Sequence, residues 1–241
     1  MAPSAMVFLA FAPAGASPVG PASADDLLSR PLALVVALAL VGLLPFLFMA
    51  LTSFVKISTV LYIARSALGA PEIPANTVVV ALAGALTLLS MAPVATRIED
   101  RLGPLFESRT ATSEWIHEAV VAVREPLRGF LSANASERQR SRFYELARST
   151  RAKADQGAVR PDDLAVVIPA FLVSELVQAF TLGFAIYLPF LVVDLVVANV
   201  LTALGMQSLS PAQVSLPFKL LLFVAADGWG LLAQTLVSGY R

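Results

Sequence analysis

The 241-residue sequence contains no cysteine and a single histidine, His117. Without cysteine the chain has no disulfide, no thiolate ligand for a metal and no cysteine nucleophile. One histidine excludes a cluster of histidine ligands and an HExxH zinc motif, and any Ser-His-Asp arrangement would depend on that one ring. We interpret His117, in the polar stretch WIHEAV, as an ordinary surface histidine. The composition therefore gives little support to a metal site or to hydrolytic catalysis.

Charged side chains are scarce as well, at 14% of the residues, whereas soluble domains typically contain about 25%. Apolar residues make up 57% of the chain. The 17 basic and 17 acidic residues give no net charge, so the chain has no global attraction for nucleic acid or for an acidic surface. This composition is typical of a membrane protein and argues against nucleic-acid binding.

The N-terminus lacks two features of a secretory signal peptide. Residues 1–24 contain no lysine or arginine, and prolines interrupt their apolar stretch, whereas a signal peptide normally has a positive start and an unbroken apolar region. Cleavage after Ala24 is the alternative. We favour a loose tail over residues 1–30, rich in proline, alanine and serine.

The uneven distribution of the few charges predicts membrane spans. Residues 97–163 contain twelve of the 17 basic and eleven of the 17 acidic residues, residues 31–55 and 73–96 contain no charge, and residues 164–236 contain four. About 20 apolar residues are enough to cross a bilayer. Hydropathy therefore predicts four spans, near residues 31–52, 75–96, 177–204 and 214–236.

The same distribution divides the chain into four parts. After the tail come apolar helices over residues 31–96, a polar segment over 97–163 and an apolar helical hairpin region over 164–241. Helical spacing in the polar segment predicts amphipathic helices at 113–131 and 136–153. The basic residues between the first two spans favour the cytoplasm for that loop, and therefore the periplasm for the polar segment.

Prolines complicate this picture of simple spans. Each proline inside a helix removes a backbone donor and tends to kink or end the helix, and carbonyls freed in this way need partners from protein or water. We therefore expect an all-α membrane-class protein with kinked helical hairpins, in which broken helices packed on other subunits are an alternative to four clean spans. The prolines within or beside the apolar runs are Pro45, Pro93, Pro169, Pro189, Pro211 and Pro217.

Four ionisable residues stand isolated in the last apolar part, namely Glu175, Asp194, Lys219 and Asp227. Because an unpaired buried charge is costly, such residues usually pair or face a watery cavity. Helical spacing places Glu175 and Gln178 on one polar stripe, and Lys219, Asp227 and Gln234 on another. We predict that Lys219 pairs with Glu175 and that the stripe of Asp227 and Gln234 meets a neighbouring subunit. The alternative for Lys219 is a position at a helix start from which it reaches water.

Other residues of the apolar runs receive simpler interpretations. We expect Lys56 and Arg65 to extend to water at the membrane surface. An aromatic stripe at helical spacing is usually part of a core rather than a pore lining, and we interpret one here in that way. Its members are Phe180, Phe184, Tyr187 and Phe190.

Three separated stretches resemble one known family. They are LTSFVKISTVLYIARSALGAPEIPANTV at 51–78, VSELVQAFTLGFAIYLPFLVVDLVVANVLTALGM at 173–206 and SPAQVSLPFKLLLFVAADGWGLL at 210–232. Together and in this order they resemble the FliP/SctR family, also called YscR or HrcR, the core membrane component of the type III secretion export apparatus. The resemblance covers residues 50–96 and 164–237 and favours the injectisome branch over the flagellar one.

The resemblance implies a ring-like helical homo-oligomer of about five copies in the bacterial inner membrane, at the base of the secretion system. Implied partners are a FliQ/SctS-like and a FliR/SctT-like export subunit, a FlhB/SctU-like switch protein, a FlhA/SctV-like export gate and exported unfolded proteins. Neither catalysis nor a cofactor is implied.

The resemblance also implies roles for individual residues. Met206 and Gln207 fall at the pore constriction, where Gln207 and Ser208 replace methionines common in the family and so thin a seal made of flexible thioether side chains. Glu175 and Lys219 fall on charged positions of the family. Two alternatives stay open, a stand-alone channel or transporter and a membrane-bound enzyme with its site in residues 97–163.

Overall fold

The computed structural model describes residues 24–70, 72–107, 112–151 and 156–240. The chain forms two units, residues 1–44 and 45–241. Residues 1–23 of the expected tail lie outside the described residues, and residues 24–30 are helical. Most of the tail prediction therefore stays a prediction.

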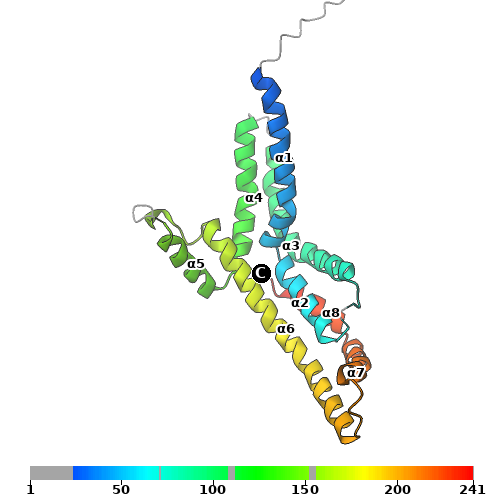
Figure 1. Cartoon of the computed structure of the whole chain (residues 1–241). Helices are drawn as coiled ribbons and strands as arrows, with labels where there is room; N and C mark the ends of the chain where they lie inside the picture. The colour runs from blue at the N-terminus through cyan, green and yellow to red at the C-terminus, as the bar shows by residue number, and fades with distance from the viewer. Residues whose placement is uncertain (1–23, 71, 108–111, 152–155, 241) are drawn as a thin grey trace, which may run out of the picture. The chain divides into compact units, whose positions relative to one another are not determined.

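The described residues form eight α-helices and a short 3-10 helix, η1, with no strand (Figure 1). The all-α fold class expected from the sequence is thus confirmed. The bounds are α1 Ala24–Leu51, α2 Phe54–Ala67, α3 Asn76–Glu107, α4 Thr112–Asn134, α5 Glu137–Ser149, η1 Gln156–Ala158, α6 Leu164–Ala203, α7 Pro211–Ala225 and α8 Gly228–Ser238.

Most predicted helices are found close to their expected positions. The two amphipathic helices of the polar segment are α4 and α5. Two helices of the described residues, α3 and α6, are each long and apolar enough to cross a membrane. Two bent pairs, the end of α1 with α2 and α7 with α8, raise this number to four if each pair makes one span. The expected spans 75–96, 177–204 and 214–236 overlap α3, α6 and the α7–α8 pair, whereas the expected span 31–52 lies on α1 and does not include α2.

The bends within the first and the last apolar runs do not fall at prolines, contrary to the expectation from sequence. Pro93 lies inside α3, and both Pro169 and Pro189 lie inside α6. Instead, the chain turns by 71° between α1 and α2 and by 57° between α7 and α8. At the first bend Thr52 Oγ1 donates to the carbonyl of Phe48 (2.5 Å) and accepts from the backbone N–H of Phe54 (3.3 Å). A side chain that bonds the backbone in this way competes with helix continuation.

Glycine ends the long helix α6. Gly205 has φ +72°, its N–H donates to Thr202, and the N–H of Met206 donates to Leu201. This is the Schellman arrangement, in which a left-handed residue after the helix satisfies its last carbonyls. The chain therefore turns sharply at residues 204–210. Helix α7 then begins with Pro211, and proline suits this first position because its missing N–H would have no partner in the helix.

The core of the second unit consists of two main clusters around α2 and α6. The first joins buried residues of α2 and α3 to single residues of α6 and α8, including Ile57, Leu61 and Leu236. The second joins α3, α4 and α6 and includes Phe130 and Phe171. Packing of α2 along α6 is close, and both helices run in the same direction (Figure 1).

At Gly183 helices α2 and α6 approach each other closely. A Cβ atom there would lie 2.5 Å from Cδ1 and 2.9 Å from Cγ2 of Ile63. We expect Gly183→Ala to destabilise the chain by about 1–3 kcal/mol through overpacking. Gly84→Ala is the control, because nothing lies within 4 Å of its added Cβ, and it should be neutral or slightly stabilising. Thermal unfolding in detergent measures both, and equal midpoints would contradict the close approach.

The polar segment is joined to the start of α6 by charges. Arg128 donates to Asp162 (2.6 Å) and to Glu125 (2.7 Å), and Arg160 lies 3.3 Å from Asp162. Desolvation raises the pKa of Asp162, but a backbone hydrogen bond and the charges of Arg160 and Arg128 outweigh it, so this pKa lies below its ordinary value. These contacts fix the turn that leads into α6.

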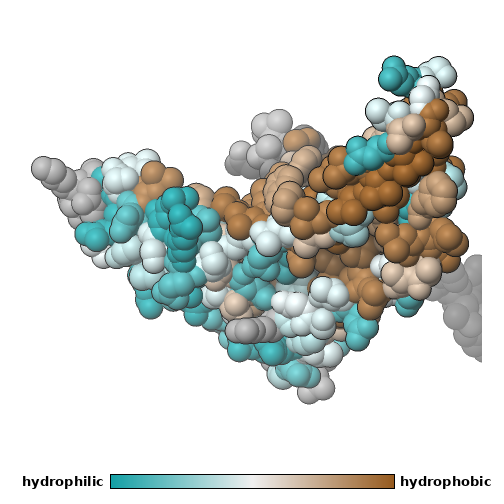
Figure 2. All heavy atoms as spheres, turned by 90° about the horizontal axis from the view of Figure 1, so that it is seen from below, coloured by the Kyte–Doolittle hydropathy of each residue, from teal (hydrophilic) through white to brown (hydrophobic). Residues whose placement is uncertain are grey.

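Much of the apolar surface of α6 is left uncovered. Up to Glu175 many of its side chains are buried by other helices, whereas large apolar side chains are exposed repeatedly from Leu176 to Leu204. Figure 2 likewise shows broad hydrophobic areas beside hydrophilic ones on one face. Exposed apolar surface of this extent marks contact with a membrane or with other chains.

Candidate functional site

A buried lysine–carboxylate pair joins α2 to α6. Lys56 Nζ lies 3.3 Å from Glu175 Oε1 and donates to Gln178 Oε1 at 3.2 Å. Lys56 is 3% exposed and Glu175 is 0% exposed. Because neither charge reaches solvent, each depends on the other for its stability. The expectation that Lys56 extends to water is therefore wrong.

The pair is closed from the C-terminal side by Tyr240. Its hydroxyl donates to Glu175 Oε2, and Lys56 Nζ lies 3.7 Å from the centroid of its ring. Such an ammonium group over an aromatic face is attracted by the ring's negative centre. The ring also stacks on Phe130, with centroids 5.8 Å apart. One residue thus provides both a hydrogen bond for the carboxylate and a π contact for the ammonium group.

Serine hydroxyl groups on nearby residues also have hydrogen-bond partners. Ser53 and Ser90 lie with their Oγ atoms 2.5 Å apart between α2 and α3. Ser174 accepts from the backbone N–H of Ser136 (2.9 Å), which ties the start of α5 to α6. Buried polar groups that find partners in this way avoid the cost of desolvation.

A second pair lies farther along α6, toward the tip of the hairpin that α6 forms with α7. Lys219 Nζ donates to Asp194 Oδ2 (2.6 Å), and Ser215 Oγ donates to Asp194 Oδ1 (2.5 Å). Lys219 Nζ also lies 3.4 Å from the carbonyl of Ala67, at the end of α2. A cation is favourable at this end of a helix because unpaired carbonyls gather there. The second pair therefore ties α7 to both α6 and α2.

The predicted pair of Lys219 with Glu175 is wrong, since each of these residues has another partner. Asp194 lies ten residues before the turn at Leu204, and Lys219 lies nine residues after its end at Ser210. An antiparallel hairpin brings these two positions level with each other. Glu175 is 19 residues farther back along α6, which is about 28 Å along the axis and beyond the reach of a lysine side chain.

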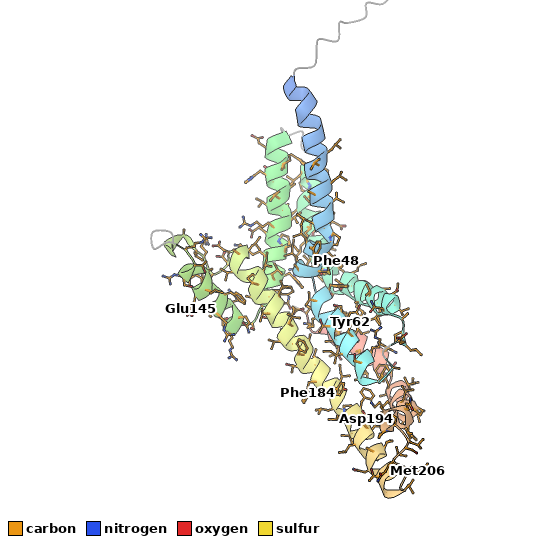
Figure 3. The ribbon with its side chains drawn as sticks, viewed as in Figure 1. Phe48, Tyr62, Glu145, Phe184, Asp194 and Met206 are labelled. Carbon is orange, nitrogen blue, oxygen red and sulfur yellow. The ribbon has the colours of Figure 1, made fainter. Side chains whose placement is uncertain are left out.

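The other predicted positions lie at the surface of the chain. Asp227 is exposed and has φ +50° between α7 and α8, and Gln178 and Gln234 are exposed on α6 and α8. Met206 is 44% exposed, and with Gln207 it lies at the turn between α6 and α7, at the far end of the hairpin in Figure 3. Their roles in subunit contact and at a constriction stay predictions.

Two further interpretations are revised. Arg65 is half-buried; it donates from Nη1 to the carbonyl of Pro74 (3.2 Å), and its guanidinium lies 5.4 Å from the Tyr62 ring centroid. Of the aromatic stripe, only Phe190 is buried, while the other three members are exposed on α6. The interpretation of that stripe as core is therefore wrong within a single chain.

Sequence reasoning missed Tyr240, Ser215 and the pairing role of Lys56. The contact between Asp194 and Lys219 could have been predicted from the hairpin register, because residues equally far along the chain from a turn lie opposite each other. No comparable signal exists for Tyr240, which lies 65 residues from Glu175 along the chain. Only the packing of α8 on α2 and α3 brings it to this pair.

These features define a class of protein, namely a helical membrane protein whose apolar helices carry internally paired charges. The sequence matches the FliP family over residues 37–236. The chain belongs to the FliP family and is a membrane component of a type III secretion export apparatus, as its three motifs indicated.

Individual relatives support this membership. The chain is 40% identical over 212 residues to virulence protein YscR of Salmonella typhimurium. This alignment covers 87% of this chain and 97% of that protein. It is 40% identical over 210 residues to Yop proteins translocation protein R of Yersinia pestis, covering 86% and 95%. It is 38% identical over 216 residues to flagellar biosynthetic protein FliP of Caulobacter vibrioides, covering 89% and 78%.

Proposed function

We propose that this chain is a pore-forming subunit of an injectisome export apparatus in the bacterial inner membrane. About five copies would form a ring around a gated passage for unfolded proteins. The FliQ/SctS-like and FliR/SctT-like subunits would complete this ring, and the switch protein and export gate would contact it. The energy for opening would come from these partners.

The uncovered length of α6 carries the proposal. Its exposed apolar side chains run from Leu176 to Leu204, a distance of about 42 Å along a straight helix. The hydrocarbon core of a bilayer is only about 30 Å thick. Lipid alone therefore does not cover an upright α6, and other protein chains are the natural cover for the rest.

Met206 and Gln207 are proposed to form the constriction. The turn that carries them is exposed, as are the neighbouring apolar residues Leu204 and Leu209. A ring of such turns would place one flexible thioether from each copy at the same level. Because Gln207 is polar, this seal would depend chiefly on Met206.

We further propose that the chain works without catalysis of its own. His117 lies exposed on α4. No group of three metal-ligating side chains occurs in the part of the chain that the structure describes. If the chain contributes assembly and no catalysis, the His117→Ala variant should assemble normally, and the apparatus that contains it should secrete its substrates normally.

Purification in mild detergent tests the proposal. The tagged chain is expected to leave the membrane as a large complex with the two other hydrophobic export subunits, and electron microscopy should show Met206 at its narrowest point. A solitary chain that transports solute in liposomes would instead support a stand-alone transporter. Lost secretion in His117→Ala despite normal assembly would support an enzyme.

A further inference from the structure

The segment from Gly228 to Tyr240 is attached differently to α6 than to the other helices. Along its length α8 packs on α3, α2 and α7. Toward α6 it has apolar contacts, where Trp229 and Leu232 pack with Phe190 and Leu236 shares a buried cluster with Ala179, and one hydrogen bond at its end, where Tyr240 donates to Glu175. Beside the apolar contacts lies an apolar groove of about 370 Å³. Tyr240 therefore carries the polar connection of this segment to α6.

The beginning of the segment has the properties of a hinge. Asp227 has φ +50° and ψ +48°, and its side chain makes no capping hydrogen bond to α8. Among residues with a Cβ atom, aspartate is one of the few that adopt this left-handed conformation, and it interrupts the helical path between α7 and α8. Gly228 follows directly, and a Cβ atom on it would lie 2.2 Å from the Phe223 ring.

The end of the segment covers a polar site inside an apolar protein. The Tyr240 hydroxyl lies 3.3 Å from the carbonyl of Ser53, and its ring covers Lys56. Beside it is a polar cavity of about 210 Å³ lined by Asn134, Gln178 and Gly239, among others. Water that enters past Tyr240 would reach both members of the buried pair.

We propose that residues 228–240 form a hinged strap that turns at Asp227 and is latched by Tyr240 over the Lys56–Glu175 pair. Release of the latch exposes the pair through the polar cavity while the second core cluster stays folded. The strap is a conformational device of the single chain, and it does not depend on the export role proposed above. Apolar packing of Leu236 also holds the strap, but among the described residues of the strap the hydroxyl of Tyr240 makes the hydrogen bond to the carboxylate, so its loss weakens closure.

A single engineered thiol tests the strap, because the sequence contains no cysteine. Ser53→Cys places a thiol of similar size at a position that is 0% exposed, where the hydroxyl faces Ser90 and the backbone carbonyl lies 3.3 Å from the Tyr240 hydroxyl. In the full chain in detergent, we expect slow labelling by a water-soluble maleimide. Tyr240→Phe keeps the ring and loses the bond to the carboxylate, so labelling should accelerate about tenfold or more. Tyr240→Ala should accelerate it further.

Two controls separate strap opening from general unfolding. Ala170→Cys reports on the second core cluster, where residue 170 is also 0% exposed, and its labelling rate should not change in Tyr240→Phe. Gln234→Ala, an exposed position on α8, should leave the Ser53→Cys rate unchanged. Equal acceleration at both thiols would overturn the proposal, and so would an unchanged rate at Ser53→Cys in Tyr240→Phe.

Hydrogen exchange provides a second measurement that needs no cysteine. In Tyr240→Phe the amides of residues 228–238 should exchange faster as one unit, while those of residues 164–175 keep their protection. Unchanged protection of α8 would overturn the strap even if Ser53→Cys failed to fold.

Discussion

Lys56→Ala is expected to destabilise the chain by about 3–5 kcal/mol, since it leaves a buried carboxylate without its counter-charge. Glu175 is 0% exposed, and its remaining hydrogen bond from Tyr240 does not neutralise the charge. The mutant should therefore unfold at a much lower temperature in detergent, as followed by circular dichroism at 222 nm.

The double variant Lys56→Met with Glu175→Met tests whether the loss comes from the unpaired charge. Replacement of a whole buried pair by apolar side chains is often neutral or stabilising, so the double variant should regain most of the lost stability. Gln178→Ala is the matched control, because Gln178 also contacts Lys56 but is exposed. A double variant as unstable as Lys56→Ala would contradict this explanation.

Lys219→Ala is expected to cost about 1–3 kcal/mol, because it removes the ammonium group that ties α7 to α6 and to the end of α2. The effect should be smaller than that of Lys56→Ala, since the side chain of Asp194 is 32% exposed and can be hydrated. Thermal unfolding in the same detergent measures the difference between the two variants.

Double-mutant cycles distinguish the partner of Lys219. We expect a coupling energy of about 1–2 kcal/mol between Lys219→Ala and Asp194→Asn, and a value near zero between Lys219→Ala and Glu175→Gln. Exchange of the two charges, with Lys219→Asp and Asp194→Lys, should restore part of the stability. Strong coupling to Glu175 would contradict the observed hairpin register.

Local sequence was sufficient for several of the helices. Uncharged runs and helical periodicity placed α3, α4, α5 and α6 near their observed positions, because burial in lipid and amphipathic packing leave repeating patterns in a sequence. Breaks were harder to predict. Pro189 stays inside α6, whereas the chain bends at Thr52 and Asp227, where side-chain bonding to the backbone or a left-handed residue ends a helix.

Composition also predicted that the isolated charges would be paired, but it did not predict which residue pairs with which. The pair of Asp194 with Lys219 depends on the hairpin register. That register can be read from the number of residues between each partner and the turn. The pair of Lys56 with Glu175 depends on which face of α2 packs on α6, and residues 119 apart carry no local signal of that contact.

The sequence by itself determined that this is a helical membrane protein of the FliP family, because hydropathy and three ordered motifs are properties of continuous stretches. The tertiary structure decided which lysine meets which carboxylate, and that Tyr240 closes the first pair. The physical reason is that an ion pair forms within about 4 Å, and such distances between remote residues are set by helix packing.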